Sequence, residues 1–500
     1  MISTMSNATN MSLRELSDRL NQVTGSGDQG VVVNHLTSDS REVRQGSVFF
    51  AVRGRDHDGH RFIDDAWEAG AVAVVAEVAP AAEEIRPWLH VPDTRVALAR
   101  LAGLWFGDPA RNLELVGITG TNGKTTTAYL VHSLCQAAQK RCGLIGTVTV
   151  DDGLGQRPAV HTTPGPLELE SMLADMRDHG CRAVAMEVSS HALDQARVAG
   201  LPFKVAVFTN LTQDHLDYHG SMEAYFDAKQ KLFEMTAEDR DARLVIPTDD
   251  TWGRRLASRF ENHPGLVTYG MGVRNQFRVG TPRFDFDGTR FELEALGRSF
   301  LVRLPLIGRF NVYNAAAALA VAHGLDLNFR EAIGNLANAP QVPGRLELMG
   351  AQLPFRVFVD YAHTPDALEN VLSALRALQP GRLITVFGCG GDRDRVKRPL
   401  MGAAVARHSH ISIVTSDNPR SEDPEVIISD VVRGMRGHRH LTVTDRREAI
   451  YLAIQHAEPR DVILIAGKGH ETYQEINGVK HEFDDREIVR RALRDFDYTA

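Results

Sequence analysis

The sequence predicts an α/β protein with three domains, in which largely parallel sheets are covered by helices. Apolar runs without polar alternation recur along the chain, as is typical of strands buried on both faces. Segments of helical periodicity separate these runs, and a length of 500 residues suggests about three domains. We expect a small α/β domain at 1–109, a central domain at 110–345 and a C-terminal doubly wound domain at 346–500.

Composition and charge narrow the class of protein. The hydrophobic content of 43% is that of an ordinary globular chain, and the net charge of −8 argues against general nucleic-acid binding. The four cysteines form no C-x-x-C pair, which fits a reducing compartment. The N-terminal residues lack the apolar core of a signal peptide, and no apolar run reaches membrane-spanning length. We expect a cytoplasmic protein without a membrane span or a nucleic-acid partner.

The N-terminal domain carries strand and helix patterns but no strong functional motif. We expect a lead with one short helix, then strands at 31–33, 48–52 and 71–76 and a helix at 62–69. Polar turns such as Ser38–Arg41 could hold a ligand, but polar turns are also ordinary loop chemistry.

The stretch Gly117–Thr127, with sequence G-I-T-G-T-N-G-K-T-T-T, lies between an apolar run and a segment of helical periodicity. Strand, glycine-rich turn and helix together allow backbone N–H groups to surround phosphates. Lys124 would reach the terminal phosphates, and Thr125 or Thr126 would offer a hydroxyl to Mg²⁺. Ile118 occupies the place of the first glycine in the usual pattern, so the loop is a variant. A purely structural turn is the alternative.

Two further strands of the central domain end in polar residues. The run 183–186 leads into Glu187, which could bind Mg²⁺ or cap a loop, and the run 205–208 leads into a polar stretch ending at His215. In parallel sheets, ligands bind at these carboxyl ends. Phe284 and Phe286 are expected to face Phe291 and Leu293 in an antiparallel hairpin, before a helix at 306–321.

Several single residues are weak signals alone. His215 could be structural, and Lys229 on a predicted helix could simply be solvated. Arg345, at the junction of two domains, could touch phosphate or form an interdomain ion pair. Asn311 and Asn314 share a helical face and could read an adenine edge or act as caps.

The C-terminal domain places polar stretches directly after predicted strands. Strands are expected at 355–359, 383–387, 411–415, 441–444 and 462–466. Four of them lead into Asp360–His363, Gly388–Asp394, Ser416–Arg420 and Gly467–Glu471. Strand ends that converge at one sheet edge form a ligand site more often than by accident.

Together these motifs resemble the Mur ligase family of peptidoglycan synthesis, over nearly the whole chain after about residue 25. The motifs are T-G-T-N-G-K-T-T, T-T-P at Thr162–Pro164, E-V-S-S-H-A-L from Glu187, D-H-L-D from Asp214, D-N-P-R from Asp417 and G-K-G-H-E from Gly467. Agreement of all six in order is not credible as chance.

The resemblance implies an N-terminal UDP-binding domain, a central phosphate-loop ATPase domain and a C-terminal Rossmann-like domain that binds an amino acid. It implies roles for residues of all three domains. Those expected to bind ATP are Gly120, Thr121, Asn122, Gly123, Lys124, Thr125, Thr126, Asn311, Asn314, Arg345 and Asp360. Those expected to bind the UDP-linked substrate are Ser40, Thr162, Thr163, Ser189, Gln195 and Arg197. Those expected to bind Mg²⁺ are Thr125, Glu187, His215 and Lys229, the last as a carbamate formed with CO₂. Lys124, Lys229, His215 and Arg345 would be catalytic.

The implied reaction is ATP-dependent amide formation through an acyl phosphate. Meso-2,6-diaminopimelate would be added to the D-glutamate of UDP-N-acetylmuramoyl-L-alanyl-D-glutamate. The D-N-P-R form goes with diaminopimelate in the family, because Arg420 can hold its far carboxylate with two hydrogen bonds. The residues implied for this pocket are Arg393, Asp417, Asn418, Pro419, Arg420, Gly467 and Glu471. We expect a monomer.

Other functions remain open from the sequence. The same ligase could add L-lysine, and a folylpolyglutamate-synthase-like ligase would share the ATP chemistry. A phosphate-loop ATPase without ligase activity would explain Lys124 and Glu187 but not the C-terminal motifs. A nucleotide-sugar binding protein without catalysis is the fourth alternative. ADP formation with and without the two acceptor substrates separates these functions.

Overall fold

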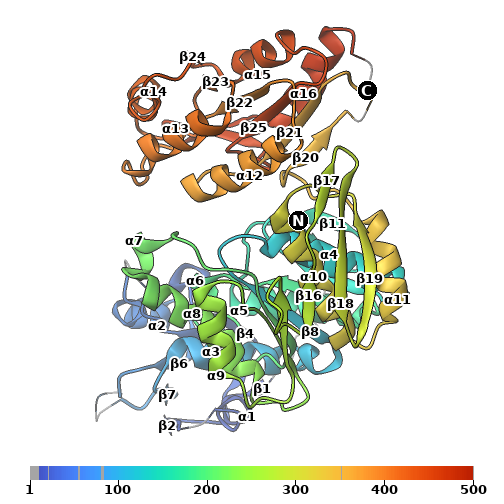
Figure 1. Ribbon diagram of the computed structural model, residues 1–500. Helices are drawn as coiled ribbons and strands as arrows, with labels where there is room; N and C mark the ends of the chain where they lie inside the picture. Colours follow the sequence, from blue (N-terminus) through green and yellow to red (C-terminus); the bar gives the residue numbers. More distant parts are fainter. Residues whose placement is uncertain are drawn as a thin grey trace.

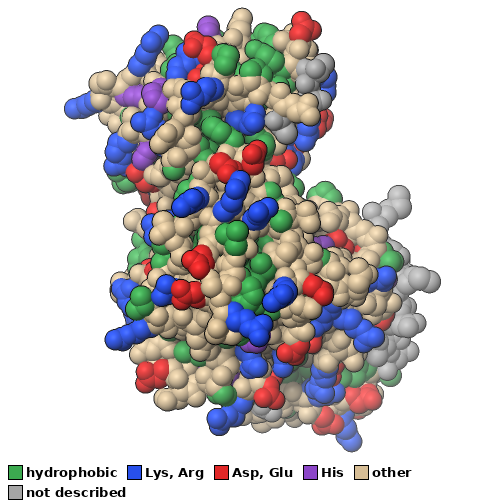
Figure 2. Space-filling model, turned by 45° about the vertical axis from the view of Figure 1, so that its right-hand side comes forward, with side chains coloured by type: hydrophobic (Ala, Val, Ile, Leu, Met, Phe, Trp, Pro, Cys, Tyr) green, Lys and Arg blue, Asp and Glu red, His purple; other side chains and the backbone are tan. Residues whose placement is uncertain are grey.

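The computed structural model describes residues 11–20, 22–54, 57–79, 81, 84–350 and 352–498. The predicted α/β class is confirmed, with one large sheet in each of three parts of the chain (Figure 1). The C-terminal part forms a separate lobe in Figure 1, and the outline narrows below this lobe in Figure 2. The exact domain boundaries stay a prediction.

The N-terminal sheet has five strands in the order β2-β7-β6-β5-β4. The predicted strands at 48–52 and 71–76 are confirmed as β5 and β6, and the predicted helix is α2 with a preceding 3₁₀ turn. The predicted strand at 31–33 instead forms a separate two-stranded pair, β1 with β3. Part of the predicted lead, residues 1–10 and 21, lies outside the described residues. The elements are β1 Met11–Ser12, α1 Leu13–Ser17, β2 Thr24–Ser26, β3 Val32–Val33, β4 His35–Thr37, β5 Ser47–Phe50, α2 Ile63–Glu68, β6 Ala71–Ala76, β7 Trp88–His90 and α3 Thr94–Trp105.

The central sheet has 12 strands, and its parallel core has the order β9-β12-β8-β13-β14-β15-β16. Antiparallel strands extend both edges. The strands are β8 Glu114–Thr119, β9 Cys142–Ile145, β10 Thr149–Asp151, β11 Gln156–Pro158, β12 Ala183–Glu187, β13 Phe203–Phe208, β14 Arg243–Pro247, β15 Leu266–Gly270, β16 Phe277–Val279, β17 Arg283–Asp285, β18 Gly288–Ala295 and β19 Arg298–Leu304.

Helices cover both faces of this core, which explains why its strands read as unbroken apolar runs. Helices α4 and α10 pack on one face, and α5, α8 and α9 pack on the other. The helix predicted at 306–321 begins slightly later, after Gly308. The helices are α4 Lys124–Ala137, α5 Pro166–Asp178, α6 Ser190–Asp194, α7 Leu216–His219, α8 Met222–Thr236, α9 Thr251–Arg259, α10 Arg309–Gly324 and α11 Phe329–Asn335.

The predicted hairpin exists, but its predicted register is wrong. Phe284 of β17 lies opposite Thr289 of β18, while Phe291 and Leu293 pair with Val302 and Phe300 of β19. The long β18–β19 ladder therefore determines the register, and β17 is a short added edge strand.

The C-terminal sheet has six strands in the order β20-β21-β25-β22-β23-β24, with β21 to β24 parallel. All five predicted strands are confirmed within a few residues, and a β26–β27 hairpin was not predicted. The elements are β20 Glu347–Met349, β21 Arg356–Asp360, α12 Pro365–Ala377, β22 Leu383–Phe387, α13 Lys397–His408, β23 Ile411–Val414, α14 Pro424–Val432, β24 His440–Thr442, α15 Arg446–Gln455, β25 Val462–Ala466, β26 Tyr473–Ile476, β27 Val479–Glu482 and α16 Asp485–Asp495.

A buried ion pair ties the outer helices of this sheet to the end of β25. Arg446 opens α15 and Asp485 opens α16, and both side chains are fully buried. The guanidinium donates to both carboxylate oxygens at 2.8 and 2.7 Å and to the carbonyl of Ala466 at 2.9 Å. A buried guanidinium needs such partners because leaving it unpaired is costly. The pair therefore fixes the backbone where β25 ends.

No helix within the described ranges combines the length and hydrophobicity needed to cross a bilayer.

Helices α3 and α5 meet across a buried carboxyl group. Glu170 of α5 is 6% exposed. Its Oε1 lies close to Gly103 of α3, because a Cβ built on Gly103 would be 3.2 Å from this oxygen. Burial, with a further contribution from Asp108, raises the pKa of Glu170 to about 7. In the unfolded chain a glutamate titrates near 4.3.

Glu170 should therefore make stability depend on pH. Because its pKa is raised in the folded protein, its contribution is fully present below the unfolded pKa and is lost as the pH rises through about 7. We expect Glu170→Gln, which stays neutral, to be more stable than the wild type at pH 8 by on the order of 2 kcal/mol. Below pH 4, where the carboxyl group is protonated in both the folded and the unfolded chain, the two melting temperatures should agree. The exposed Glu168→Gln on the same helix is the control, and an equal shift at both pH values would contradict the prediction.

Candidate active site

The loop after β8 requires glycine at two positions. Gly120 has φ +145°, and a Cβ there would lie 1.8 Å from Oγ1 of Thr209. Gly123 precedes α4 with φ +86°, and a Cβ there would lie 2.4 Å from Oδ1 of Asn314. The backbone thus turns sharply into the helix N-terminus, where free N–H groups and the helix dipole favour phosphate.

Two lysines donate to the same loop carbonyl. Nζ of Lys124 lies 3.0 Å from the carbonyl of Gly120 and 2.8 Å from that of Thr121. Nζ of Lys229, on α8, lies 2.8 Å from the carbonyl of Gly120 and 4.4 Å from the centre of the Tyr225 ring. Burial lowers the pKa of both lysines, and the charge of Lys124 lowers that of Lys229 further. The structure therefore favours a neutral amine at Lys229.

Glu187, at the end of β12, accepts hydrogen bonds from two threonine hydroxyl groups. Its Oε2 accepts from Oγ1 of Thr125 and from Oγ1 of Thr147, both at 3.1 Å, and its Oε1 accepts from the amide of Thr147 at 2.7 Å. A carboxylate and a hydroxyl beside a phosphate loop suit Mg²⁺, which takes few protein ligands and keeps water and phosphate oxygens. Among the described residues no cluster of three His, Cys, Asp or Glu could hold a metal by itself.

His215 lies in the same region. It precedes α7 with φ +53°, and its ring meets that of His191 edge-on at 4.9 Å. Burial lowers the pKa of His215, an effect that Asp214 partly offsets. A neutral imidazole is the form that can bind a metal.

The residues expected to bind the UDP-linked substrate form one connected cluster, with one exception. Oγ1 of Thr163 donates to the carbonyl of Glu187 at 2.9 Å and accepts from the amide of Ser189 at 3.0 Å. Arg197 donates to the carbonyl of Thr163 at 2.8 Å and to Oε1 of Gln195 at 2.7 Å. Thr162 joins through Thr147, with their hydroxyl oxygens 3.0 Å apart. Ser40 opens a 3₁₀ turn of the N-terminal domain, and no hydrogen bond in the described ranges links it to this cluster.

Arg345 connects the C-terminal lobe to the phosphate loop. Its Nη2 lies 3.3 Å from Oγ1 of Thr125, and its guanidinium carbon lies 4.6 Å from the centre of the Tyr361 ring. Its Nε is buried without a partner among the described residues. Nδ2 of Asn122 in the phosphate loop also donates to Oδ2 of Asp366 in the C-terminal lobe, at 3.5 Å.

Three residues expected to contact ATP are occupied by internal hydrogen bonds. Asp360 accepts from the amides of Leu346 at 2.6 Å and Ala362 at 2.7 Å. Asn311 donates to the carbonyl of Ile307 at 2.9 Å, and Asn314 accepts from Thr127 at 3.3 Å. Neither asparagine supplies a side-chain cap to α10, and a role in reading adenine stays a prediction.

The four polar stretches of the C-terminal domain do meet at one sheet edge, since they follow the neighbouring strands β21, β25, β22 and β23. Asn418 donates to Oε2 of Glu471 at 3.0 Å. Gly467 has φ +120°, and a Cβ there would lie 2.4 Å from Oδ2 of Asp417. Beside Gly390, a Cβ would lie 3.0 Å from Nη1 of Arg420 and 3.8 Å from Cγ of Arg393.

Arg420 is already partly paired. It has φ +53°, its Nη1 donates to the carbonyl of Gly391 at 2.7 Å, and its Nε lies 3.5 Å from Glu475. The β26–β27 hairpin, which contributes Glu475, bonds to the backbone of Arg420 on both sides. The carbonyl of the preceding residue, Pro419, packs against Gly391, where a Cβ would lie 1.9 Å from the carbonyl oxygen.

The linker before this lobe is in close contact with the G-K-G-H-E loop. Gly344 has φ +66°, and a Cβ there would lie 2.2 Å from the amide nitrogen of His470. A Cβ at Gly469 would in turn lie 2.8 Å from the carbonyl of Gly344.

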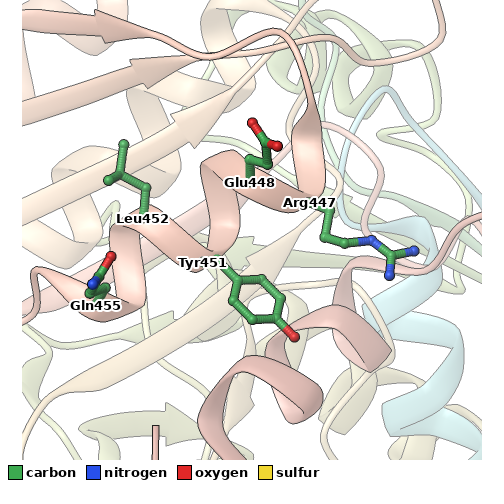
Figure 3. Close-up of a pocket in the computed structure, with 5 residues that line it drawn as sticks. All are labelled: Arg447, Glu448, Tyr451, Leu452 and Gln455. Carbon is green, nitrogen blue, oxygen red and sulfur yellow. The ribbon is translucent and has the colours of Figure 1, made fainter. Parts of the chain in front are cut away.

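Sequence reasoning missed three polar participants of the site: Thr147, Lys468 and Glu475. Lys468 lies inside the recognised G-K-G-H-E motif, so a role for this lysine could have been predicted from the sequence. Thr147 and Glu475 carry no local signal, because each reaches the site through tertiary packing. The hollow in Figure 3 is lined by Arg447, Glu448, Tyr451, Leu452 and Gln455 of α15; it contains none of the predicted site residues.

The fold and the loop geometry define a phosphate-loop α/β protein whose site is completed by a second parallel sheet. Comparison with known proteins identifies the family. The Mur ligase catalytic-domain model matches residues 32–105, the Mur ligase middle-domain model matches 118–322, and the Mur ligase glutamate ligase domain model matches 344–469. The chain belongs to the Mur ligase family.

Several known proteins are similar to nearly the whole chain. The UDP-N-acetylmuramoyl-L-alanyl-D-glutamate–2,6-diaminopimelate ligases of Geobacter metallireducens and Syntrophomonas wolfei are each 44% identical, over 97% of this chain and 99% of theirs. A solved structure of a ligase of the same name is 34% identical, with a TM-score of 0.71 over 98% of this chain and all of that one. A folylpolyglutamate synthase of Mycobacterium tuberculosis, at 21% identity and TM-score 0.61 over 75% of this chain and 92% of its own, shares the fold.

The clearance around Gly120 leads to a prediction for nucleotide binding. Gly120→Ala places a methyl group against Thr209 in a backbone conformation that alanine adopts poorly. We expect the affinity for ATP, measured by calorimetry, to fall at least about tenfold. Gly334→Ala on α11, where a Cβ meets no atom within 4 Å, is the matched control and should bind as the wild type does. Undiminished binding by Gly120→Ala would show that the loop does not hold phosphate.

Proposed function

We propose that the protein is an ATP-dependent ligase that adds meso-2,6-diaminopimelate to the D-glutamate of UDP-N-acetylmuramoyl-L-alanyl-D-glutamate, in peptidoglycan synthesis. The observation that carries this proposal is the D-N-P-R loop, Asp417–Arg420, at a sheet edge that Arg345 connects to the phosphate loop. The whole-length similarity to ligases that carry this name supports it. ATP and the two acceptor substrates are then the partners.

The reaction needs activation because a carboxylate is a poor electrophile. Transfer of the γ-phosphoryl group of ATP to the D-glutamate side chain gives an acyl phosphate and ADP. The amine of diaminopimelate attacks the acyl carbon, phosphate leaves with the bonding electron pair, and the amine loses its extra proton. Lys124 and Arg345 supply positive charge near the phosphoryl group in transfer. Closure of the C-terminal lobe would exclude water, which would hydrolyse the acyl phosphate.

Magnesium fits the donors at the end of β12. Thr125, Glu187 and His215 are the residues that would hold it, with Lys229 after carbamylation. When bound, Mg²⁺ supplies charge neutralisation of the phosphates. The chain itself holds the oxygen donors in place, since Thr147 and Thr125 both hydrogen-bond to Glu187.

Carbamylation of Lys229 has a physical basis in its surroundings. Only a neutral amine reacts with CO₂: Nζ forms a bond to the carbon, a C–O π pair moves to oxygen, and a proton is released. Burial and the nearby Lys124 favour that neutral form. The product is an anion beside Lys124, so a neutral amine next to a cation is replaced by an ion pair.

The preference for diaminopimelate over lysine follows from unpaired charge. Diaminopimelate carries a carboxylate and an ammonium at its far end, and lysine carries only the ammonium. Arg420 would bind the carboxylate and Glu471 the ammonium, while lysine would leave Arg420 without this partner. L-Lysine as substrate is the alternative within this function.

An assay of ADP formation tests the function directly. We expect ADP release only when ATP, UDP-N-acetylmuramoyl-L-alanyl-D-glutamate and diaminopimelate are all present, and little release when lysine replaces diaminopimelate. Release with ATP alone would indicate a plain ATPase, and no release under any condition would indicate a binding protein. Equal or greater use of lysine would overturn the assigned amino acid but not the ligase.

A variant of Lys229 tests the carbamate. We expect Lys229→Ala to lose at least about a hundredfold in turnover and to bind the UDP-linked substrate normally, because the lysine acts on the phosphoryl side of the site. Lys231→Ala, on the same helix and 45% exposed, is the control. Added short-chain carboxylates should restore part of the activity of Lys229→Ala. Full activity of this variant would remove the carbamate from the mechanism.

A further inference from the structure

Lys468 is a fully buried cation in the amino-acid pocket. It follows β25 directly, within the loop that contributes Gly467 and Glu471, and its side chain is 0% exposed. Its Nζ donates to Oδ1 of Asn418 at 3.0 Å and to Oε2 of Glu471 at 3.1 Å. A buried ammonium is stable only with such partners. The two partners are residues proposed above to bind diaminopimelate.

The contacts fix which way the Asn418 amide points. Its Oδ1 accepts from two donors, Nζ of Lys468 and the backbone amide of Glu475, each at 3.0 Å. An amide nitrogen at that position would face two donors, which is unfavourable. Nδ2 must therefore point the other way, where it donates to Oε2 of Glu471 at 3.0 Å.

The same contacts fix the carboxylate of Glu471. Its Oε2 accepts from both Lys468 and Asn418, while its side chain remains 19% exposed. The aromatic ring of Tyr473 lies 5.5 Å from Nζ of Lys468 and 4.4 Å from that of the exposed Lys480. Lys468 is thus held by the hairpin on one side and orients two side chains on the other.

Four charged side chains at the pocket form two pairs of opposite charge. Lys468 accompanies Glu471, and Glu475 accompanies Arg420 at 3.5 Å. A ligand group with one positive and one negative charge, such as the far end of diaminopimelate, can join these pairs without leaving a net charge. A group with only an ammonium cannot. Preorganised partners of this kind lower the entropic cost of binding.

We propose that Lys468 is a positioning residue that sets amino-acid specificity, by holding Glu471 and Asn418 in the orientation that reads a zwitterionic far end. This inference rests on the proposed function. Lys468 does not contact the reacting atoms in this account and acts through Glu471 and Asn418. A purely structural lysine would instead tie β25 to the hairpin, and its loss would affect all substrates alike.

The test compares Lys468→Met with Lys480→Met in the full-length enzyme. Methionine keeps much of the side-chain volume and removes the charge. We expect Lys468→Met to raise the KM for diaminopimelate at least about tenfold, with the KM for ATP and for the UDP-linked substrate within about twofold. The ratio of kcat/KM for diaminopimelate over L-lysine should fall. Lys480→Met also removes a cation beside Tyr473 but none beside Glu471, and should behave as the wild type does.

A double-mutant cycle with Glu471→Gln completes the test. If Lys468 acts through Glu471, adding Lys468→Met to Glu471→Gln should cost less than about threefold more in kcat/KM for diaminopimelate. The proposal would be overturned if the losses in kcat/KM of the two single variants multiplied in the double variant. Equal rises in all three KM values, or tighter binding of diaminopimelate by Lys468→Met, would also overturn it. Melting temperatures identify a variant that fails to fold; in that case Glu471→Gln alone must reproduce the selective rise in KM, and its absence overturns the proposal. Wild-type turnover with diaminopimelate tests the function separately.

Discussion

The structure depends on bringing the carboxyl edges of two parallel sheets together. One edge carries the phosphate loop and Glu187, and the other carries the D-N-P-R and G-K-G-H-E loops. Under the proposed function, one edge would bind ATP and the other the incoming amino acid, so neither edge would be sufficient alone. Arg345 spans the junction, with its guanidinium over Tyr361 of one part and hydrogen-bonded to Thr125 of the other. A planar cation with several donors is suited to such a bridge.

Burial changes the protonation of the lysines in the central site. Two lysines share one carbonyl oxygen, which no pair of fully charged ammonium groups would do at low cost. Burial, and then the charge of Lys124, lower the pKa of Lys229 and favour a neutral amine there. In the C-terminal domain the opposite arrangement is found, since the buried cations Arg446 and Lys468 are each paired with a carboxylate.

Much of the fold could be predicted from the sequence, for physical reasons that also explain the errors. Strands such as β6, β22 and β25 are buried on both faces, so their apolar runs identify them almost to the residue. The β17–β18 register was wrong because the pattern of Phe284 and Phe286 fits more than one pairing, and the long contact with β19 decides. The β26–β27 hairpin is largely exposed and carries no apolar alternation.

The candidate site divides in the same way. Glycines and charged residues directly after strands were predictable, because strand ends in parallel sheets bind ligands. Thr147 and Glu475 were not, since each arrives from a loop or hairpin that only tertiary packing places beside Glu187 or Arg420. Lys468 was visible in its motif, but its partners Asn418 and Glu471 emerge only from the folded loops.

The close approach of Gly344 to the loop around His470 fixes the neighbouring Arg345 to the C-terminal lobe. The backbone of Gly344 lies against Gly469 and His470 with no room for a side chain, and the amide of Leu346 is bonded to Asp360. Residues 344–346 are therefore packed as part of the C-terminal lobe, so any hinge between the lobes would lie earlier in the chain. If that lobe swings away, the amino-acid pocket and the bridging guanidinium leave together, so the enzyme cannot present its cation to phosphate without also presenting its acceptor.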